Sequence, residues 1–217
     1  MKNLILIAVL TLFIISCKEK KETIPEPEVK ELTIAEKIAN AHGFENWKHV
    51  SQINFTFNEQ RNWSWNTKSN EVTLITETDT LTYNRKKVDS LSTKANGGFV
   101  NDKFWALIPF QLVWDKGLTI SESSISEAPI SKSQLNKITI TYSNEGGYTP
   151  GDAYDIFYDD TFIIKEWVFR RGNSEKPSLT NTFENYQDFN GIKIATEHKT
   201  DDGGWNLKLS NIKVITD

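Results

Sequence analysis

Four aspartates lie close together in the sequence and have the clearest potential for chemistry: Asp152, Asp155, Asp159 and Asp160. Grouped carboxylates can bind Ca²⁺ or act together as general acid and base. On a β-strand, however, Asp152 and Asp155 would point to opposite faces, and Asp159-Asp160 is typical of a hairpin turn. The sequence therefore favours structural roles for these carboxylates over calcium binding or hydrolysis.

Three histidines, His42, His49 and His198, offer metal ligands or a general base. Their spacing matches no recognised ligand cluster, and His42 and His49 flank an expected helix end. The chain also has no nucleophile elbow, zinc-protease motif, phosphate-binding loop or dinucleotide fingerprint. We therefore expect no metal, no cofactor and no enzymatic activity. The least favoured function is a hydrolase, which would need His198 or the aspartates of residues 152–160 to meet in one cleft.

Two adjacent arginines, Arg170 and Arg171, end an apolar segment. Such a pair can bind a lipid head group, because a guanidinium matches the geometry of a phosphate. We expect instead that they protect a sheet edge and form ion pairs with one of three nearby acids: Asp159, Asp160 or Glu166.

The elements that would position these residues are mostly short strands. One helix is predicted over residues 34–42, because Thr33 and Glu36 fit a capping box and Gly43 suits the C-terminal end. After it, apolar and polar residues alternate with the period of two that is typical of strands. We expect roughly eight to eleven strands in one antiparallel sheet, curled into a barrel, a half-barrel or a sandwich. The alternating segments are 53–57, 63–65, 72–74, 81–83, 138–140, 154–158, 163–169, 192–194 and 205–209.

One segment, Phe104 to Trp114, does not alternate and is apolar at every position except Gln111. Asn101 or Asp102 could cap a short helix here, which Pro109 would end. The segment is too short to span a bilayer and too apolar to lie in water. It is expected to cover the concave face of the sheet, either as a plug that completes the core or as a lid over a lipid-sized cavity.

Composition excludes several classes of protein. Hydrophobic residues make up 38% and charged residues 25%, which is ordinary for a globular protein of one domain. The net charge of −4 leaves no basic surface of the kind that nucleic acid requires. A single cysteine excludes a disulfide within the chain.

The first sixteen residues read as a signal peptide. Lys2 precedes an apolar run from Leu4 to Ile15, which is too short for a membrane span. The sequence Ile14-Ile15-Ser16-Cys17 then resembles the lipobox of bacterial lipoproteins. That resemblance implies that Cys17 becomes the first residue of the mature protein and carries a diacylglycerol and an N-acyl chain such as palmitate, which together anchor it stably.

Residues 17–32 are expected to form a tether between the lipid and the fold. From Lys18 to Glu31 the segment is rich in Glu and Lys and contains Pro25 and Pro27, so it has too little apolar surface to form a core. In bacterial lipoproteins an Asp after the cysteine usually signals retention in the inner membrane. Lys18 stands there, so we expect an outer-membrane lipoprotein that faces the periplasm, with export to the cell surface as an alternative.

Four motifs give a wider resemblance: AEKIANAHGFENWKHV (35–50), FWALIPFQLVWDKG (104–117), GGYTPGDAYD (146–155) and IKEWVFRRG (164–172). Together they resemble an uncharacterised family of bacterial envelope lipoproteins, and the similarity covers most of the chain from Thr33 onward. That family is similar in architecture to the LolA/LolB lipoprotein carriers. The resemblance implies a mainly β domain over residues 33–217, a LolA-like half-barrel with short helices over its concave face and a hydrophobic cavity.

We therefore expect a non-enzymatic, monomeric protein that binds a lipid or another amphipathic ligand beneath the 104–114 segment. The alternative is a structural or partner-docking envelope lipoprotein with a solid core. The alternation does not say which face of each strand is concave. If the aromatic faces point inward, the cavity walls are Phe55, Phe57, Trp63, Trp65, Phe104, Trp105, Leu107, Ile108, Trp114, Ile140, Trp167 and Phe169.

Overall fold

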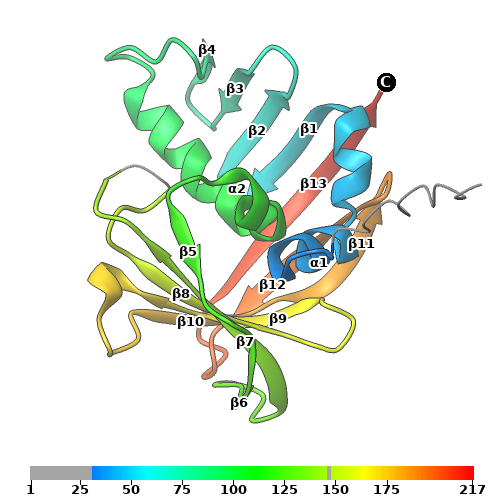
Figure 1. Cartoon of the computed structure of the whole chain (residues 1–217). Helices are drawn as coiled ribbons and strands as arrows, with labels where there is room; N and C mark the ends of the chain where they lie inside the picture. Colours follow the sequence, from blue (N-terminus) through cyan, green and yellow to red (C-terminus); the bar gives the residue numbers. More distant parts are fainter. Residues whose placement is uncertain (1–30, 146–147) are drawn as a thin grey trace, which may run out of the picture. The chain divides into compact units, whose positions relative to one another are not determined.

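Antiparallel strands dominate the structure, as the alternation of apolar and polar residues predicts (Figure 1). The computed structural model describes residues 31–145 and 148–217, and Leu32–Asp217 form one unit by their internal contacts. The predicted signal peptide, Cys17 and the tether up to residue 30 lie outside the described residues.

The first sheet has seven strands in the order β11-β12-β13-β1-β2-β3-β4. Alternation sets its buried face: Ile53, Phe55, Trp63 and Trp65 are all at most 6% exposed. The register pairs Phe55 with Trp63 and Ile53 with Trp65. The strand bounds are β1 (Val50–Phe57), β2 (Arg61–Asn66), β3 (Glu71–Ile75), β4 (Thr80–Asn84), β11 (Glu184–Phe189), β12 (Ile192–Lys199) and β13 (Asn206–Thr216).

The second sheet has the order β10-β9-β8-β7-β5, with β6 also paired to β7. Its bounds are β5 (Leu118–Ile120), β6 (Ser124–Glu127), β7 (Gln134–Tyr142), β8 (Ala153–Tyr158), β9 (Ile164–Arg170) and β10 (Leu179–Thr182), and the 3₁₀ turn η2 (Arg171–Asn173) follows β9. The described residues form thirteen strands in two sheets that do not close into a barrel, so the predicted strand number and the single sheet are wrong, whereas the mainly β, antiparallel fold is confirmed. The missed strands gave little periodic signal, because β5 has only three residues and β6, β10 and β11 are largely polar.

Helix α1 (Ile34–Ala41) begins at the predicted capping box. The Thr33 hydroxyl accepts from the Glu36 backbone N–H, and the Glu36 carboxylate accepts from the Thr33 N–H. Gly43 follows with φ 93°, in the left-handed region that L side chains rarely adopt. A Cβ there would lie 1.8 Å from the Gly191 carbonyl oxygen, so this position requires glycine before the 3₁₀ helix η1 (Phe44–His49).

Helix α2 (Thr93–Trp114) corrects the prediction of a short helix that Pro109 ends. The helix has 22 residues, and Asp102 lies inside it rather than capping it. Proline lacks an N–H and clashes with the carbonyl four residues earlier, so a straight helix cannot pass through it. The backbone leaves the helical region at Leu107 (φ −130°, ψ 28°) and resumes at Ile108. Pro109 thereby occupies the first turn of a second helical piece, where its missing N–H has no cost.

Helix α2 packs against both sheets and completes the core (Figure 1). Its Phe99 ring lies 5.4 Å from that of Trp63 on β2, and its Trp105 ring lies 4.5 Å from that of Trp167 on β9. Tyr148 stacks on Phe104 at 3.8 Å with the rings nearly parallel. The apolar 104–114 segment therefore lies among aromatic side chains from strands far apart in the sequence.

Candidate functional site

The structure brings the residues expected to line a cavity together in one interior. Ten of the twelve are buried, and Trp114 and Phe169 are half-buried. The aromatic faces therefore point inward, which periodicity alone could not decide. Several of these side chains touch one another, since Phe104 and Trp105 both pack on Trp167. Phe110, which was not among the predicted residues, packs on Trp114 at 5.5 Å between ring centroids.

A pocket of about 560 Å³ lies beside the first half of α2. Such a volume is typical of small-molecule sites. We call it the apolar pocket because aliphatic and aromatic side chains form much of its wall. Its lining residues are Arg61, Trp63, Leu74, Thr76, Thr78, Asp79, Leu81, Leu91, Lys94, Ala95, Gly98 and Asn101. Trp63 is the residue that it shares with the predicted cavity wall.

A fixed cation lies in the wall of the apolar pocket. The Arg61 guanidinium donates to both oxygens of Asp102, at 2.7 and 2.8 Å, and Asp102 is fully buried. The Trp63 indole N–H donates to the same carboxylate at 2.7 Å, so two residues of the pocket wall, Arg61 and Trp63, both bind Asp102. The bond to Asp102 raises the pKa of Arg61. Arg61 is therefore a permanent, oriented positive group whose own charge is balanced by Asp102.

A second buried cation, Lys103, lies on α2 and forms no ion pair with any acid of residues 31–145 and 148–217. Its ammonium donates to Gln111 Oε1 at 2.8 Å and lies over the rings of Trp65 and Trp114, at 5.8 and 5.5 Å. Burial lowers the pKa of Lys103 to about 8, with the Arg85 charge acting in the same direction. The hydrogen bond joins the two pieces of α2 across the Leu107 break. The sequence offered no signal for this, because Lys103 and Gln111 are eight positions apart on a bent helix.

The histidines do not meet. His49 is exposed, whereas His42 and His198 are each fully buried. The Nδ1–H of His42 donates to the Ile38 carbonyl at 2.8 Å, and that of His198 donates to the Thr182 carbonyl at 3.2 Å. Burial lowers the pKa of each to about 4, so both are neutral near pH 7.

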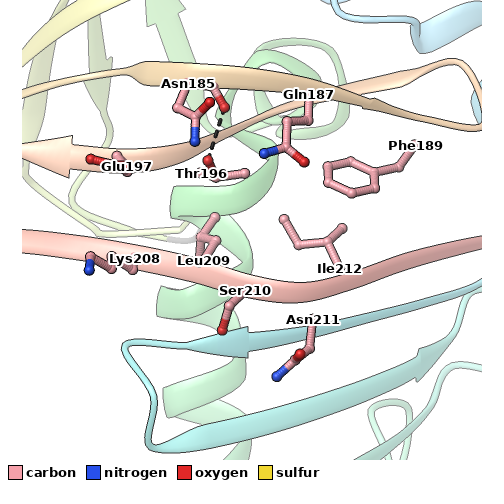
Figure 2. A pocket seen from close by; sticks show the side chains of 10 residues that line it. All are labelled: Asn185, Gln187, Phe189, Thr196, Glu197, Lys208, Leu209, Ser210, Asn211 and Ile212. Carbon is pink, nitrogen blue, oxygen red and sulfur yellow. Dashed lines mark hydrogen bonds between the residues drawn. The ribbon is translucent and has the colours of Figure 1, made fainter.

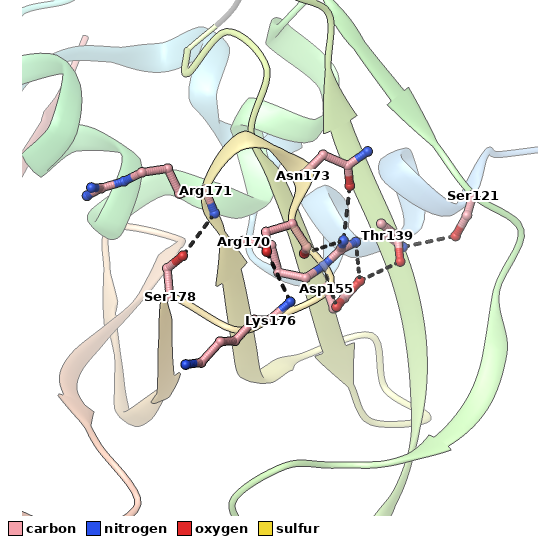
Figure 3. A network of polar contacts seen from close by, with 9 residues as sticks. Ser121, Thr139, Asp155, Arg170, Arg171, Asn173, Lys176 and Ser178 are labelled. Atoms are coloured by element: carbon pink, nitrogen blue, oxygen red, sulfur yellow. Dashed lines mark hydrogen bonds and ion pairs between the residues drawn. The ribbon is translucent and has the colours of Figure 1, made fainter.

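Asp155, one of the four grouped aspartates, belongs to a network of polar contacts that joins neighbouring strands (Figure 3). The prediction that Arg170 pairs with Asp159, Asp160 or Glu166 is wrong. Its guanidinium donates to the Asp155 carboxylate, at 3.0 and 3.2 Å, because β8 and β9 are neighbouring strands of one sheet. Asp155 also accepts from Thr139, and the backbone of Arg171 donates to Ser178. In the part of the chain that the structure describes, no group of three or more His, Cys, Asp or Glu side chains could hold a metal ion.

The other acids of this region also have structural partners. Asp159 accepts from Thr161 and Ile163 in the predicted hairpin turn and pairs with Lys165 at 3.0 Å. Asp152 accepts from the Gly172 N–H at 2.7 Å. Glu166 is buried and accepts from the backbone of Ile130 and Ser131.

A polar groove of about 460 Å³ separates β11 and β12 from β13 (Figure 2). Strand β12 pairs with β13 only from Glu197 to Lys199. Beyond that point β13 contains a bulge at Asn211, where φ is 51°, and bulges bend strands apart. The lining is rich in amides and hydroxyls: Asn185, Gln187, Phe189, Thr196, Glu197, Lys208, Leu209, Ser210, Asn211 and Ile212.

Comparison with known proteins adds no family. No family model, no curated protein and no solved structure matches this chain. Among the described residues, no helix combines the length and the apolar character needed to cross a bilayer. Any functional conclusion therefore depends on the residues and contacts above.

Proposed function

We propose that this protein is an outer-membrane lipoprotein, anchored through acylated Cys17 and facing the periplasm, that binds the acyl part of a lipid or another amphipathic molecule without catalysis. We propose further that its fold is a LolA-like half-barrel, with α2 as the cover. The main support for ligand binding is the apolar pocket, because its lining combines aliphatic and aromatic side chains with charged groups.

The apolar side chains of that pocket suit the acyl part of an amphipath. Trp63, Leu74, Leu81 and Ala95 offer apolar surface to a chain. The lining also includes the carboxylate of Asp79 and the exposed Lys94, which forms no ion pair within the described residues, so a polar head of either sign would find a partner there. Each buried methylene contributes about 0.8 kcal/mol, so affinity should rise roughly fourfold per methylene until the pocket is full.

Two neighbouring glycines provide a matched test. A Cβ on Gly98 would lie 3.7 Å from the Trp63 ring, in ordinary contact, and a leucine there would extend into the apolar pocket. A Cβ on Gly97 meets nothing within 4 Å. Both residues belong to α2, so both changes to leucine favour the helix equally.

The measurement is displacement of an environment-sensitive dye by saturated fatty acids of increasing length, on residues 32–217. Gly98→Leu should weaken fatty-acid binding at least tenfold, whereas Gly97→Leu should leave it unchanged. An affinity that does not depend on chain length, or an equal response of the two variants, would exclude the apolar pocket as the lipid site.

The packing of α2 favours one alternative, a structural or partner-docking lipoprotein with a solid core. Phe104, Leu107, Ile108 and Phe110 are each at most 1% exposed and are enclosed by other side chains. This alternative predicts that no fatty acid displaces the dye and that the acylated protein co-purifies with an envelope complex.

A further inference from the structure

Four buried polar atoms without a hydrogen-bond partner belong to three interior residues, one each on β9, β10 and β12. They are the indole nitrogen of Trp167, Nε2 of His198, and both amide atoms of Asn181. None of these residues is more than 2% exposed. Buried polar groups are almost always hydrogen-bonded, to protein, to ordered water or to a ligand, so four such atoms require a physical explanation.

The three residues share the same neighbours. The Trp105 ring lies 4.5 Å from that of Trp167 and 5.2 Å from that of His198. Phe183 lies 5.2 Å from Trp167 and 4.5 Å from His198. Asn181 is the direct partner of Trp167 in the β9–β10 register, and side chains at such positions are about 5 Å apart. The three residues therefore belong to one aromatic cluster in the core.

The unpartnered atoms of these three residues include both hydrogen-bond donors and acceptors, and none of them is charged. The Trp167 N–H and the Asn181 NH₂ are donors. The Nδ1–H of His198 is used by the Thr182 carbonyl, which leaves Nε2 as an acceptor beside the Asn181 carbonyl oxygen. No ion pair of the described residues includes these side chains, and burial keeps His198 uncharged near pH 7. A matching group must donate and accept together and must carry no charge, since an ion would be buried without a counter-ion.

A surface hollow lies next to this cluster. It is lined by Thr180, Thr200, Asp201, Asp202, Gly204 and Trp205. Thr180 directly precedes Asn181, and the half-exposed Trp205 lies 6.0 Å from Trp105. The Trp105 ring thus contacts both the cluster, through Trp167 and His198, and the wall of the hollow, through Trp205.

We propose that Asn181, Trp167 and His198 form an interior binding site for the uncharged polar group of a ligand, a hydroxyl or a primary amide, with the hollow beside Trp205 as its entrance. This site does not include the residues of the apolar pocket and does not depend on lipid binding there. The competing explanation is that ordered water alone occupies the site.

The test is nuclear magnetic resonance of the full chain in a non-ionic detergent, with ¹⁵N-labelled tryptophan and the Trp167 indole signal assigned through Trp167→Phe. Propanamide and 1-propanol should move that signal to higher proton frequency and saturate. Propionate, which has the shape of propanamide and a negative charge, should bind at least tenfold more weakly.

Two variants locate the site. Asn181→Leu keeps the branching and the number of heavy atoms but removes a donor and an acceptor, so it should weaken propanamide binding about tenfold or more. Trp205→Leu should leave the affinity within twofold and make exchange of the bound probe several-fold faster. If Asn181→Leu does not fold, the comparison of propanamide with propionate on the unchanged chain still decides.

Three results would overturn the proposal. The Trp167 indole proton could exchange with solvent water while its signal does not move with any probe, which would assign the site to ordered water. Propionate could bind as well as propanamide, which would exclude a neutral site. An equal response in Asn181→Leu would place the probe elsewhere in the protein.

Discussion

Acid should destabilise this protein through its two buried histidines before it protonates most carboxylates. His198 is fully buried, and burial lowers its pKa from an ordinary 6.5 to about 4. Between these values the unfolded chain binds a proton that the folded chain excludes. The stabilisation is therefore complete above about pH 6.5 and is lost as the pH falls toward 4.

The size of the effect follows from the two pKa values. The lowered pKa corresponds to about 3 kcal/mol when the full pH range is crossed. Between pH 7 and pH 4.5, the linkage relation gives a loss of about 2–3 kcal/mol of unfolding free energy for His198. His42 has the same lowered value, so the two together remove about 5 kcal/mol, a large part of the stability of an ordinary domain.

The assay is urea unfolding followed by tryptophan fluorescence at pH 7 and pH 4.5. His198→Phe should keep the ring contacts with Trp105 and Phe183, although it loses the bond to the Thr182 carbonyl. That loss is independent of pH, so the variant should be less stable at pH 7 but should show a pH difference smaller by about 2–3 kcal/mol. His49→Phe changes an exposed histidine and should keep the full difference. An unchanged difference in His198→Phe would refute the reasoning.

Three further outcomes are expected. Lys103 has a pKa of about 8 in the folded state against an ordinary 10.5, so between these values the unfolded chain binds more protons than the folded chain. The unfolding free energy should therefore rise by about 3 kcal/mol as the pH increases from 8 to 10.5. Urea unfolding of Lys103→Met should lack that rise. Gly97→Ala should raise the unfolding free energy by about 0.5–1 kcal/mol, measured by thermal melting, since its Cβ meets no other atom. Cys17→Ser should abolish incorporation of a labelled fatty acid and release the protein from membranes, whereas labelling that persists would place the acyl chain on another residue.

The sequence predicted those features of the fold that depend on residues close together in the chain. Thr33 and Glu36 identified the start of α1, because a capping box involves residues three positions apart. The spacing of Trp63 and Trp65 placed both on one face of β2, because alternation is a property of the strand itself. Strands β10 and β11 were missed since their apolar residues do not alternate with a clear period, and pairing with β9 and β12 stabilises them instead.

The contacts that define the candidate sites join residues far apart in the chain. Arg61 and Asp102 are 41 positions apart, and nothing near either residue indicates the other. Pairing of this kind depends on where α2 crosses the first sheet, which is set by the packing of Phe99 between Trp63 and Trp65. Sequence reasoning found the aromatic side chains of that packing but could not find the polar partners that it brings together.

The polar groups inside the aromatic core show where hydrophobic patterning reaches its limit. Asp102 is fully buried, yet it accepts from Arg61 and Trp63, so its burial is compensated. Lys103, the next residue, has one neutral acceptor and two aromatic faces, and its lowered pKa records the incomplete compensation. Asn181 has no partner within the described residues for either amide atom. A core selected for stability alone would replace such groups with apolar ones of similar volume, so substitution of Asn181, which belongs to the proposed interior site, should separate stability from binding.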